Sequence, residues 1–145
     1  MNLFKEAEKA TQGTRYPLEA VLGALRFNAD GLIPAIAQQH DTGEVLMMAW
    51  MNEAALRETL ETGRVCYWSR SRRQLWRKGE SSGQVQHLKG LRADCDGDTL
   101  LLLVDQTGPA CHSGRRSCFY NAIDREGMTV ASEPLIPPEE LYGRS

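Results

Sequence analysis

The stretch VQHLKGLRADCDGDTLLLLVDQ, residues 85–106, contains two segments of strand character joined by a short polar turn. Asp-Gly-Asp is common in hairpin turns, and the segments on both sides of it have the composition of strands. The stretch therefore predicts a β-hairpin. Its turn also carries Asp94, Cys95, Asp96 and Asp98, whose side chains are cation ligands in many proteins. The turn is thus a candidate functional site.

Patterns on both sides of the hairpin predict further strands and two short helices. Residues 32–51 contain two strand-like runs with a tight turn at Asp41–Thr42–Gly43 between them. Other strands are expected at 64–71 and 118–123, helices at 17–27 and 53–61, and a basic polar loop at 72–83. Asn52 is expected to cap the second helix and Gly63 to end it.

The length of 145 residues suits one domain with a core of its own. The predicted fold class is α+β and β-rich, as a single small domain. Within it we expect an N-terminal lead-in with a short helix over 1–26, a main domain over 27–125 and a C-terminal tail over 126–145.

Composition excludes several classes of protein. The net charge of −2 gives no general attraction to nucleic acid or to an anionic membrane. No apolar run approaches the roughly 20 residues that cross a bilayer. The first residues, MNLFKEAEKATQGTR, lack the apolar centre of a signal peptide, so we expect a cytoplasmic protein. Its four cysteines are then expected to be metal ligands or buried thiols.

The three aspartates of the turn suggest a site for a hard cation. In an extended backbone Asp94 and Asp96 would share one face, and carboxylates that close repel one another unless a cation or a donor lies among them. Oxygen ligands suit Mg²⁺ or Ca²⁺. An EF-hand is excluded, because the sixth position from Asp94 is Thr99 and the twelfth is Asp105. A plain solvated hairpin turn is the alternative.

Three cysteines suggest a second, softer site. Cys95, Cys111 and Cys118 are spaced C-x15-C-x6-C, without the close pairs of a structural zinc ribbon. Three protein ligands leave the fourth position that a catalytic zinc needs for water. His112 is either a proton carrier or the fourth ligand. Buried thiols without metal are the alternative reading, and Cys66 is expected to lie in the core.

A basic segment follows the strand expected at 64–71. Arginine, lysine and serine side chains bind phosphate well, and glycines allow close approach of the backbone. Interleaved tryptophans can stack on a base or belong to the core. The residues expected to bind a phosphorylated small molecule are Trp68, Ser69, Arg70, Ser71, Arg72 and Lys78. A solvated charged face is the alternative, and one short patch on an acidic chain does not support nucleic-acid binding.

Taken together, these segments resemble the phosphoribosyl-AMP cyclohydrolase family. The matching pieces, in order, are FNADGLIPAIAQ, DTGEVLMMAWMN, YWSRSR, LWRKGESSG, DCDGD and GPACHSGRRSCF. They cover roughly residues 27–120. The resemblance is to the form without the pyrophosphohydrolase domain that is fused in some relatives.

The resemblance implies an enzyme of the third step of histidine biosynthesis. Members of the family hydrolyse the purine ring of phosphoribosyl-AMP between N1 and C6, using Zn²⁺ and Mg²⁺. Carried onto this chain, Cys95, Cys111 and Cys118 match the zinc ligands, and Asp94, Asp96 and Asp98 match the magnesium ligands. The family is an intertwined homodimer in which the thiolate equivalent to Cys95 comes from the partner. His112 is the candidate general acid or base.

Two other functions use similar residues. A nucleobase deaminase would attack the same ring carbon, but the H-x-E and P-C-x-x-C signature is absent, since GPACHSG has no second cysteine at that spacing. A zinc-stabilised nucleic-acid module would need a fourth structural ligand, and its binding would depend steeply on salt. Neither is favoured by the sequence.

Overall fold

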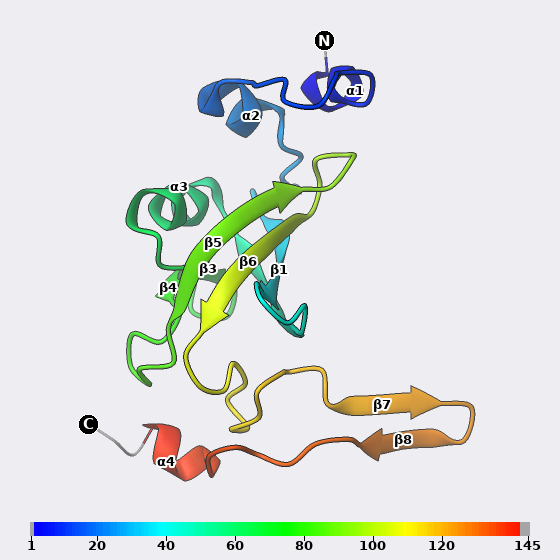
Figure 1. Ribbon diagram of the computed structural model, residues 1–145. Helices are drawn as coiled ribbons and strands as arrows, with labels where there is room; N and C mark the ends of the chain where they lie inside the picture. The colour runs from blue at the N-terminus through cyan, green and yellow to red at the C-terminus, as the bar shows by residue number, and fades with distance from the viewer. Residues whose placement is uncertain (1, 143–145) are drawn as a thin grey trace.

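The predicted hairpin is present and forms one edge of a six-stranded sheet (Figure 1). The computed structural model describes residues 2–142. The strands of the sheet are β1 Ile33–Gln39, β2 Val45–Met51, β3 Cys66–Ser69, β4 Gln74–Arg77, β5 Gln86–Ala93 and β6 Leu100–Gln106. Their order is β4-β3-β2-β1-β6-β5, and only β1 and β6 run parallel to each other.

The sheet curls so that its two sides approach each other. Arg64, just before β3, forms an isolated bridge with His87 of β5. Val65 N–H donates to the carbonyl of Gln86 at 3.0 Å, and Leu88 N–H donates to the carbonyl of Gly63 at 2.7 Å. These bonds bring the start of β3 beside β5, although three strands, β2, β1 and β6, separate the two in the order of the sheet. The predicted α+β, β-rich single domain is therefore confirmed.

Alternating side chains of the central strands form the core. On β1 every second residue is buried, and β6 follows the same pattern with Leu100, Leu102 and Val104. This period of two is what a pleated strand imposes on a sheet with one covered face. Within the described residues, α3 Glu53–Thr62 packs against β2 and β3 and adds Ala55 and Leu56 to the core.

The predicted ends of α3 are confirmed. The side chain of Asn52 accepts a hydrogen bond from the backbone N–H of Ala55 at 2.8 Å. Gly63 ends the helix with φ of 76°, a left-handed conformation that a residue without Cβ adopts at little cost. The helix predicted at 17–27 is also present, as α2 Leu18–Ala24.

Three sequence predictions need correction. The basic loop expected at 72–83 contains β4, because the four residues Gln74–Arg77 pair with β3 and place the Trp76 ring 5.5 Å from that of Tyr67. The strand expected at 118–123 is displaced to β7 Asn121–Asp124, which forms a separate hairpin with β8 Gly127–Val130. Two helices were not expected, α1 Leu3–Ala7 and α4 Pro138–Tyr142.

The domain limits proposed at 26/27 and 125/126 stay predictions. α2 ends before the first limit, whereas the β7–β8 hairpin crosses the second. The helices within residues 2–142 are all too short or too polar to span a bilayer.

We expect Leu102→Ala to lower the free energy of unfolding by about 2–5 kcal/mol, because it removes methyl groups from the middle of β6 and leaves a cavity. Urea denaturation followed by tryptophan fluorescence measures this. Val45→Ala is the matched control, because Val45 is 42% exposed and its truncation should cost well under about 1 kcal/mol. Equal effects of the two variants would contradict the assignment of the core.

Candidate functional site

The turn between β5 and β6 brings the three predicted aspartates together. One carboxylate oxygen from each of Asp94, Asp96 and Asp98 lies within 4.8 Å of the others. The grouping comes from a tight turn and not from the strand alternation expected for Asp94 and Asp96, since β5 ends at Ala93. Gly97, at φ 70°, makes the turn possible.

Electrostatic repulsion is present within this turn. Hydrogen bonding to Asp94 raises the pKa of Asp98, and the charges of Asp94 and Asp96 act in the same direction. Partial desolvation opposes ionisation of Asp94, but backbone donors outweigh it and lower the pKa of that carboxyl. One donor is the N–H of Asp98, at 3.0 Å from Asp94 Oδ1. Three exposed carboxylates held at this spacing fit a hard divalent cation, which would relieve the repulsion.

Cys111 and Cys118 meet in the loop that follows β6. Both are free thiols, with Cys111 buried and Cys118 half-buried. Burial raises the pKa of Cys118 to about 12, and the neighbouring Cys111 contributes through its charge and a hydrogen bond. The sulfur of Cys111 accepts from the hydroxyl of Ser113 at 3.1 Å and lies 3.4 Å from its backbone N. Donors aimed at a sulfur stabilise its thiolate, so this pair fits a soft metal ion.

The third predicted thiol is not with the other two. Cys95 is exposed in the turn before β6, whereas Cys111 and Cys118 lie after it. β6 has seven residues, so its ends are about 20 Å apart at about 3.3 Å per residue. Figure 1 shows the β5–β6 turn beside the N-terminal helices and the loop after β6 at the opposite end. Within one chain, the structure therefore does not assemble the three cysteines.

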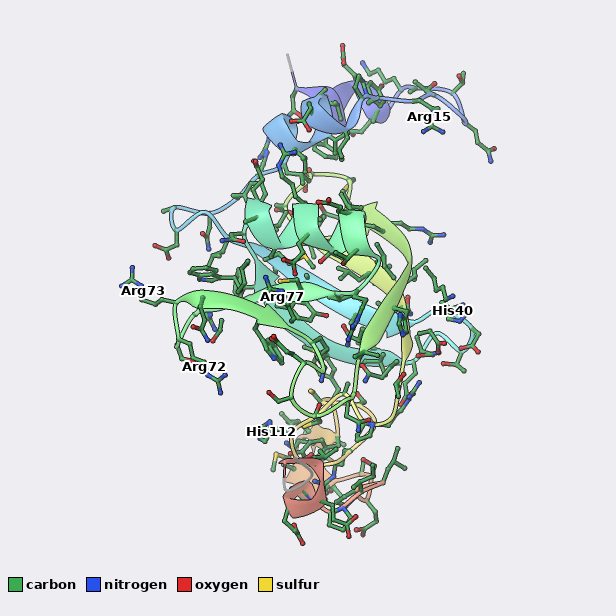
Figure 2. All side chains as sticks on the ribbon, turned by 90° about the vertical axis from the view of Figure 1, so that its left-hand side faces the viewer. Arg15, His40, Arg72, Arg73, Arg77 and His112 are labelled. Carbon is green, nitrogen blue, oxygen red and sulfur yellow. The ribbon has the colours of Figure 1, made fainter. Side chains whose placement is uncertain are left out.

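His112 accompanies the thiol pair. It is exposed, directly after Cys111. Figure 2 shows it close to α4, at the end of the molecule away from α1 and α2. Its position allows contact with a molecule bound beside the thiols.

A buried lysine lies near the thiols. Lys78 is 7% exposed, and its Nζ lies 5.7 Å from the centre of the Trp76 ring. Burial lowers the pKa of Lys78, while Cys118 and Cys111 are near enough to act in the opposite direction. The predicted substrate residue Lys78 and two predicted zinc ligands are therefore neighbours.

The side chain of Arg116 fixes the loop between the thiols. Its two terminal nitrogens donate to the carbonyls of Gln106 and Gly108, at 3.0 and 2.9 Å, and to the side-chain oxygen of Gln39 at 2.8 Å. It also forms an ion pair with Glu44 at 3.3 Å. The sequence alone gave Arg116 no role, because the adjacent Arg115 is the same residue type and only the fold shows that the contacts of the two differ.

A chain of buried polar side chains continues from this arginine into the core. Gln106 accepts from Gln86 at 2.8 Å, and Gln86 in turn accepts from the hydroxyl of Tyr67 at 2.7 Å. Burial raises the pKa of Tyr67, and Cys118 is close enough to add to that shift. The thiol loop is thus attached to β1, β5 and β6 through satisfied polar groups.

We expect Arg116→Met to lower the free energy of unfolding by about 1.5–3 kcal/mol, because three half-buried hydrogen bonds from a charged group are lost. Thermal and urea unfolding of the metal-free protein measure this. Arg115→Met is the matched control: Arg115 donates to the Ser132 carbonyl at an exposed position and lies over the Tyr120 ring. A cost for Arg116→Met no greater than that of the control would show that the loop is fixed by other contacts.

The structure divides the predicted substrate residues between two clefts. Successive residues of β3 and its turn point to opposite sides, as in any strand. The cleft of about 370 Å³ is lined by Asp30, Leu32, Asn52, Trp68, Arg70 and Arg73. The cleft of about 400 Å³ on the other side is lined by Ser69, Ser71, Arg72, Gln74, Leu75, Trp76, Lys78, Gly79, Glu80, Ser81 and Ser82. Of these two clefts, only the second is lined by Lys78, the residue that neighbours the thiols.

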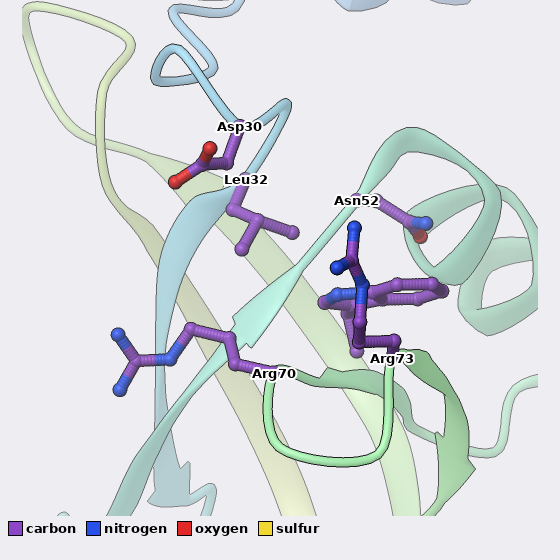
Figure 3. A pocket seen from close by; sticks show the side chains of 6 residues that line it. Asp30, Leu32, Asn52, Arg70 and Arg73 are labelled. Atoms are coloured by element: carbon purple, nitrogen blue, oxygen red, sulfur yellow. The ribbon is translucent and has the colours of Figure 1, made fainter.

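Arg73 belongs to the basic segment but was not among the residues expected to bind the substrate. It is the only non-glycine residue among those described with a positive φ, of 54°, and it lines the smaller cleft. Figure 3 shows Arg73 on the side of Asn52, whereas Arg70 extends the other way. Arg70 also lies over the Trp50 ring at 5.0 Å. Three arginines lie within the four residues of this turn, and the sequence gives no signal that distinguishes the directions of their side chains.

Comparison with known proteins gives the family. The family model described as phosphoribosyl-AMP cyclohydrolase matches residues 47–120. The phosphoribosyl-AMP cyclohydrolase of Alkalilimnicola ehrlichii is 72% identical over 98% of this chain and 100% of its own length. Those of Chromohalobacter salexigens and Hydrogenovibrio crunogenus are 69% and 66% identical, over 97% and 96% of this chain and 96% and 95% of their own lengths. This chain belongs to the phosphoribosyl-AMP cyclohydrolase family.

Membership of the phosphoribosyl-AMP cyclohydrolase family confirms the resemblance found in the sequence, and it confirms that the chain is a hydrolase. The residues matched by the family model include the acidic turn and the thiol loop. They exclude α1, α2 and the tail after Tyr120. The assignment of individual metal and substrate residues stays a prediction.

Proposed function

We propose that this chain hydrolyses the purine ring of phosphoribosyl-AMP between N1 and C6, the third step of histidine biosynthesis. The proposal rests on the 72% identity with a named phosphoribosyl-AMP cyclohydrolase over nearly the whole chain. In the reaction one water is consumed. Its oxygen is bonded to C6, which becomes the carbon of a carboxamide, and N1 gains a proton as the ring bond breaks.

The donor sets of the chain suit two metals. Asp94, Asp96 and Asp98 would hold Mg²⁺, and Cys111 and Cys118, with Cys95 from a second copy, would hold Zn²⁺. A zinc ion bound by three protein ligands provides Lewis acidity and a water of lowered pKa at neutral pH.

The chain's own residues would bind the substrate and move its protons. The larger cleft offers the Lys78 ammonium, the Arg72 guanidinium and the Ser69 hydroxyl, which suit a phosphate group. It adjoins the thiol pair through Lys78, so a nucleotide held there would present its ring to the thiol loop. His112 is exposed on that loop, where an imidazole can deliver a proton to N1.

We expect chelation of zinc to abolish ring opening, and zinc alone to restore it in the presence of Mg²⁺. Absorbance of the opened product during turnover of phosphoribosyl-AMP measures this. Cys111→Ser should lower kcat by at least about a hundredfold, because a serine hydroxyl replaces a zinc thiolate. Cys66→Ser is the matched control, since Cys66 is a buried thiol at the start of β3 whose backbone N–H donates to Thr59 of α3. Zinc-loaded, folded protein without turnover would refute the proposed reaction.

The separation of the cysteines supports a site shared by two copies of the chain. Because β6 lies between Cys95 and the Cys111–Cys118 pair, three thiolates meet only if a second chain supplies one of them. Such an arrangement needs an isologous pair, in which each chain gives its turn and receives the partner's. The dimer would therefore contain two equivalent zinc sites.

The β7–β8 hairpin offers a surface for the second copy. Figure 1 shows it extending away from the six-stranded sheet. Ile123 is 80% exposed, and its cross-strand neighbour Met128 is 61% exposed. Val130 lies on the same face, two residues from Met128, and is 55% exposed. A two-stranded hairpin has little stability of its own, so an apolar face on this one is consistent with contact to a partner.

We expect Cys95→Ser and Cys111→Ser chains to complement each other. Each variant alone should be inactive. A dimer of one Cys95→Ser chain and one Cys111→Ser chain has one intact site, so random exchange should restore about a quarter of wild-type activity. Mixing after mild dissociation, with zinc present, tests this. Activity that stays at the level of the single variants would contradict a shared site; Cys111→Ser mixed with Cys118→Ser is the control that must not recover.

A further inference from the structure

The two terminal segments lie outside the residues matched by the family model, yet each contacts one of the two candidate metal loops. The N-terminal segment, residues 2–26, reaches the acidic turn at residues 94–98. The C-terminal segment, residues 131–142, reaches the thiol loop at residues 111–118. Both contacts are made at a glycine with positive φ, Gly97 at 70° and Gly114 at 84°. The pairing of a glycine with a terminal segment therefore occurs at both loops.

Phe4 of α1 packs directly on the acidic turn. A Cβ added to Gly97 would lie 2.5 Å from two carbons of the Phe4 ring, so the ring rests on the backbone of the turn. The carbonyl of Gly97 also accepts from the N–H of Arg26 at 2.7 Å. The side chain of Asn2 caps α1 by accepting a hydrogen bond from the N–H of Phe4 at 3.0 Å. This cap fixes the start of the helix and thereby the position of Phe4. The turn is thereby held by the N-terminal segment from two directions.

The C-terminal segment crosses the thiol loop through its backbone. The N–H of Leu135 donates to the carbonyl of Gly114 at 2.8 Å, and that of Ile136 lies 3.4 Å from the same oxygen. A Cβ on Gly114 would collide with the carbonyl oxygen of Ile136, so no larger residue fits beneath the crossing. Leu141 of α4 is buried at 3% exposure and anchors the segment further along.

We propose that the terminal segments are positioning elements for the two halves of the metal centre, with Phe4 fixing the acidic turn and the Leu135–Ile136 backbone fixing the thiol loop. The inference rests on the proposed function, because it takes the aspartates and cysteines as metal ligands. Residues that orient ligands without touching the metal commonly change metal affinity 10–100-fold when altered. Both loops are tight turns whose central glycines are flexible alone, so an outside contact is needed to fix their ligands.

The N-terminal half is tested with Mg²⁺ alone. Phe4→Ala should weaken Mg²⁺ binding, measured by isothermal titration calorimetry, by about tenfold. Phe4→Leu keeps an apolar side chain on Gly97 and should recover most of the affinity. Lys9→Ala changes an exposed residue near α1 and should have no effect. If Phe4→Ala binds Mg²⁺ within about twofold of the wild type while its metal-free Tm falls, Phe4 only stabilises the fold and the proposal is wrong.

The C-terminal half is tested with Zn²⁺ in competition with a chelating dye. Leu135→Pro removes the N–H that reaches Gly114, whereas Leu135→Ala removes only a side chain that is 61% exposed. We expect about tenfold weaker zinc binding for the proline variant alone, with Mg²⁺ binding unchanged. Equal loss of both metals, or of zinc in both variants, would refute the proposal. So would a wild-type chain that binds neither metal.

These measurements need no substrate. Failure to open the ring of phosphoribosyl-AMP would refute the proposed reaction and leave the affinity changes to be judged separately. Conversely, turnover with unaltered metal affinity in Phe4→Ala and Leu135→Pro would keep the reaction and remove the positioning role.

Discussion

The parallel pairing of β1 with β6 is the constraint on which the other features depend. It places β6 inside the sheet, so that the backbone of β6 is hydrogen-bonded to a neighbouring strand on both edges and every second side chain is buried. The two loops that carry the candidate metal ligands leave its opposite ends. A rigid strand of about 20 Å cannot fold back to unite them. A single zinc site built from both loops, as proposed above, would therefore need one of them from a second chain.

The buried polar side chains behind the thiol loop have a related role. An unpaired amide or hydroxyl in a core is costly, whereas a fully satisfied chain of them ties its members to one geometry. Arg116, Gln106, Gln86 and Tyr67 form such a chain from the edge of the loop to the centre of the sheet. The loop has little regular structure, yet its position relative to β1, β5 and β6 is defined. Hydrogen bonds made by side chains, and not a strand ladder, hold this loop in place.

Most of the sheet could be predicted from the sequence because its strands alternate and its turns contain glycine or aspartate. The limits of α3 followed from Asn52 and Gly63, whose side-chain and backbone chemistry act locally. β4 was missed because its stability comes from pairing with β3, and α1 because Phe4 owes its place to Gly97, distant in sequence. The acidic and thiol motifs were recognisable by composition. Their distance from each other, and the division of the basic residues between two clefts, required the fold.

Arg73 shows how the chain balances two opposing demands. Its backbone is left-handed, which costs a residue with a Cβ about 1–2 kcal/mol, and glycine at the same place would relax it. Glycine would also remove a guanidinium from the cleft beside Asn52. The protein thus keeps a locally unfavourable backbone in order to present a positive charge at a chosen point. A version of this hairpin selected for thermal tolerance alone would be expected to lose that arginine first.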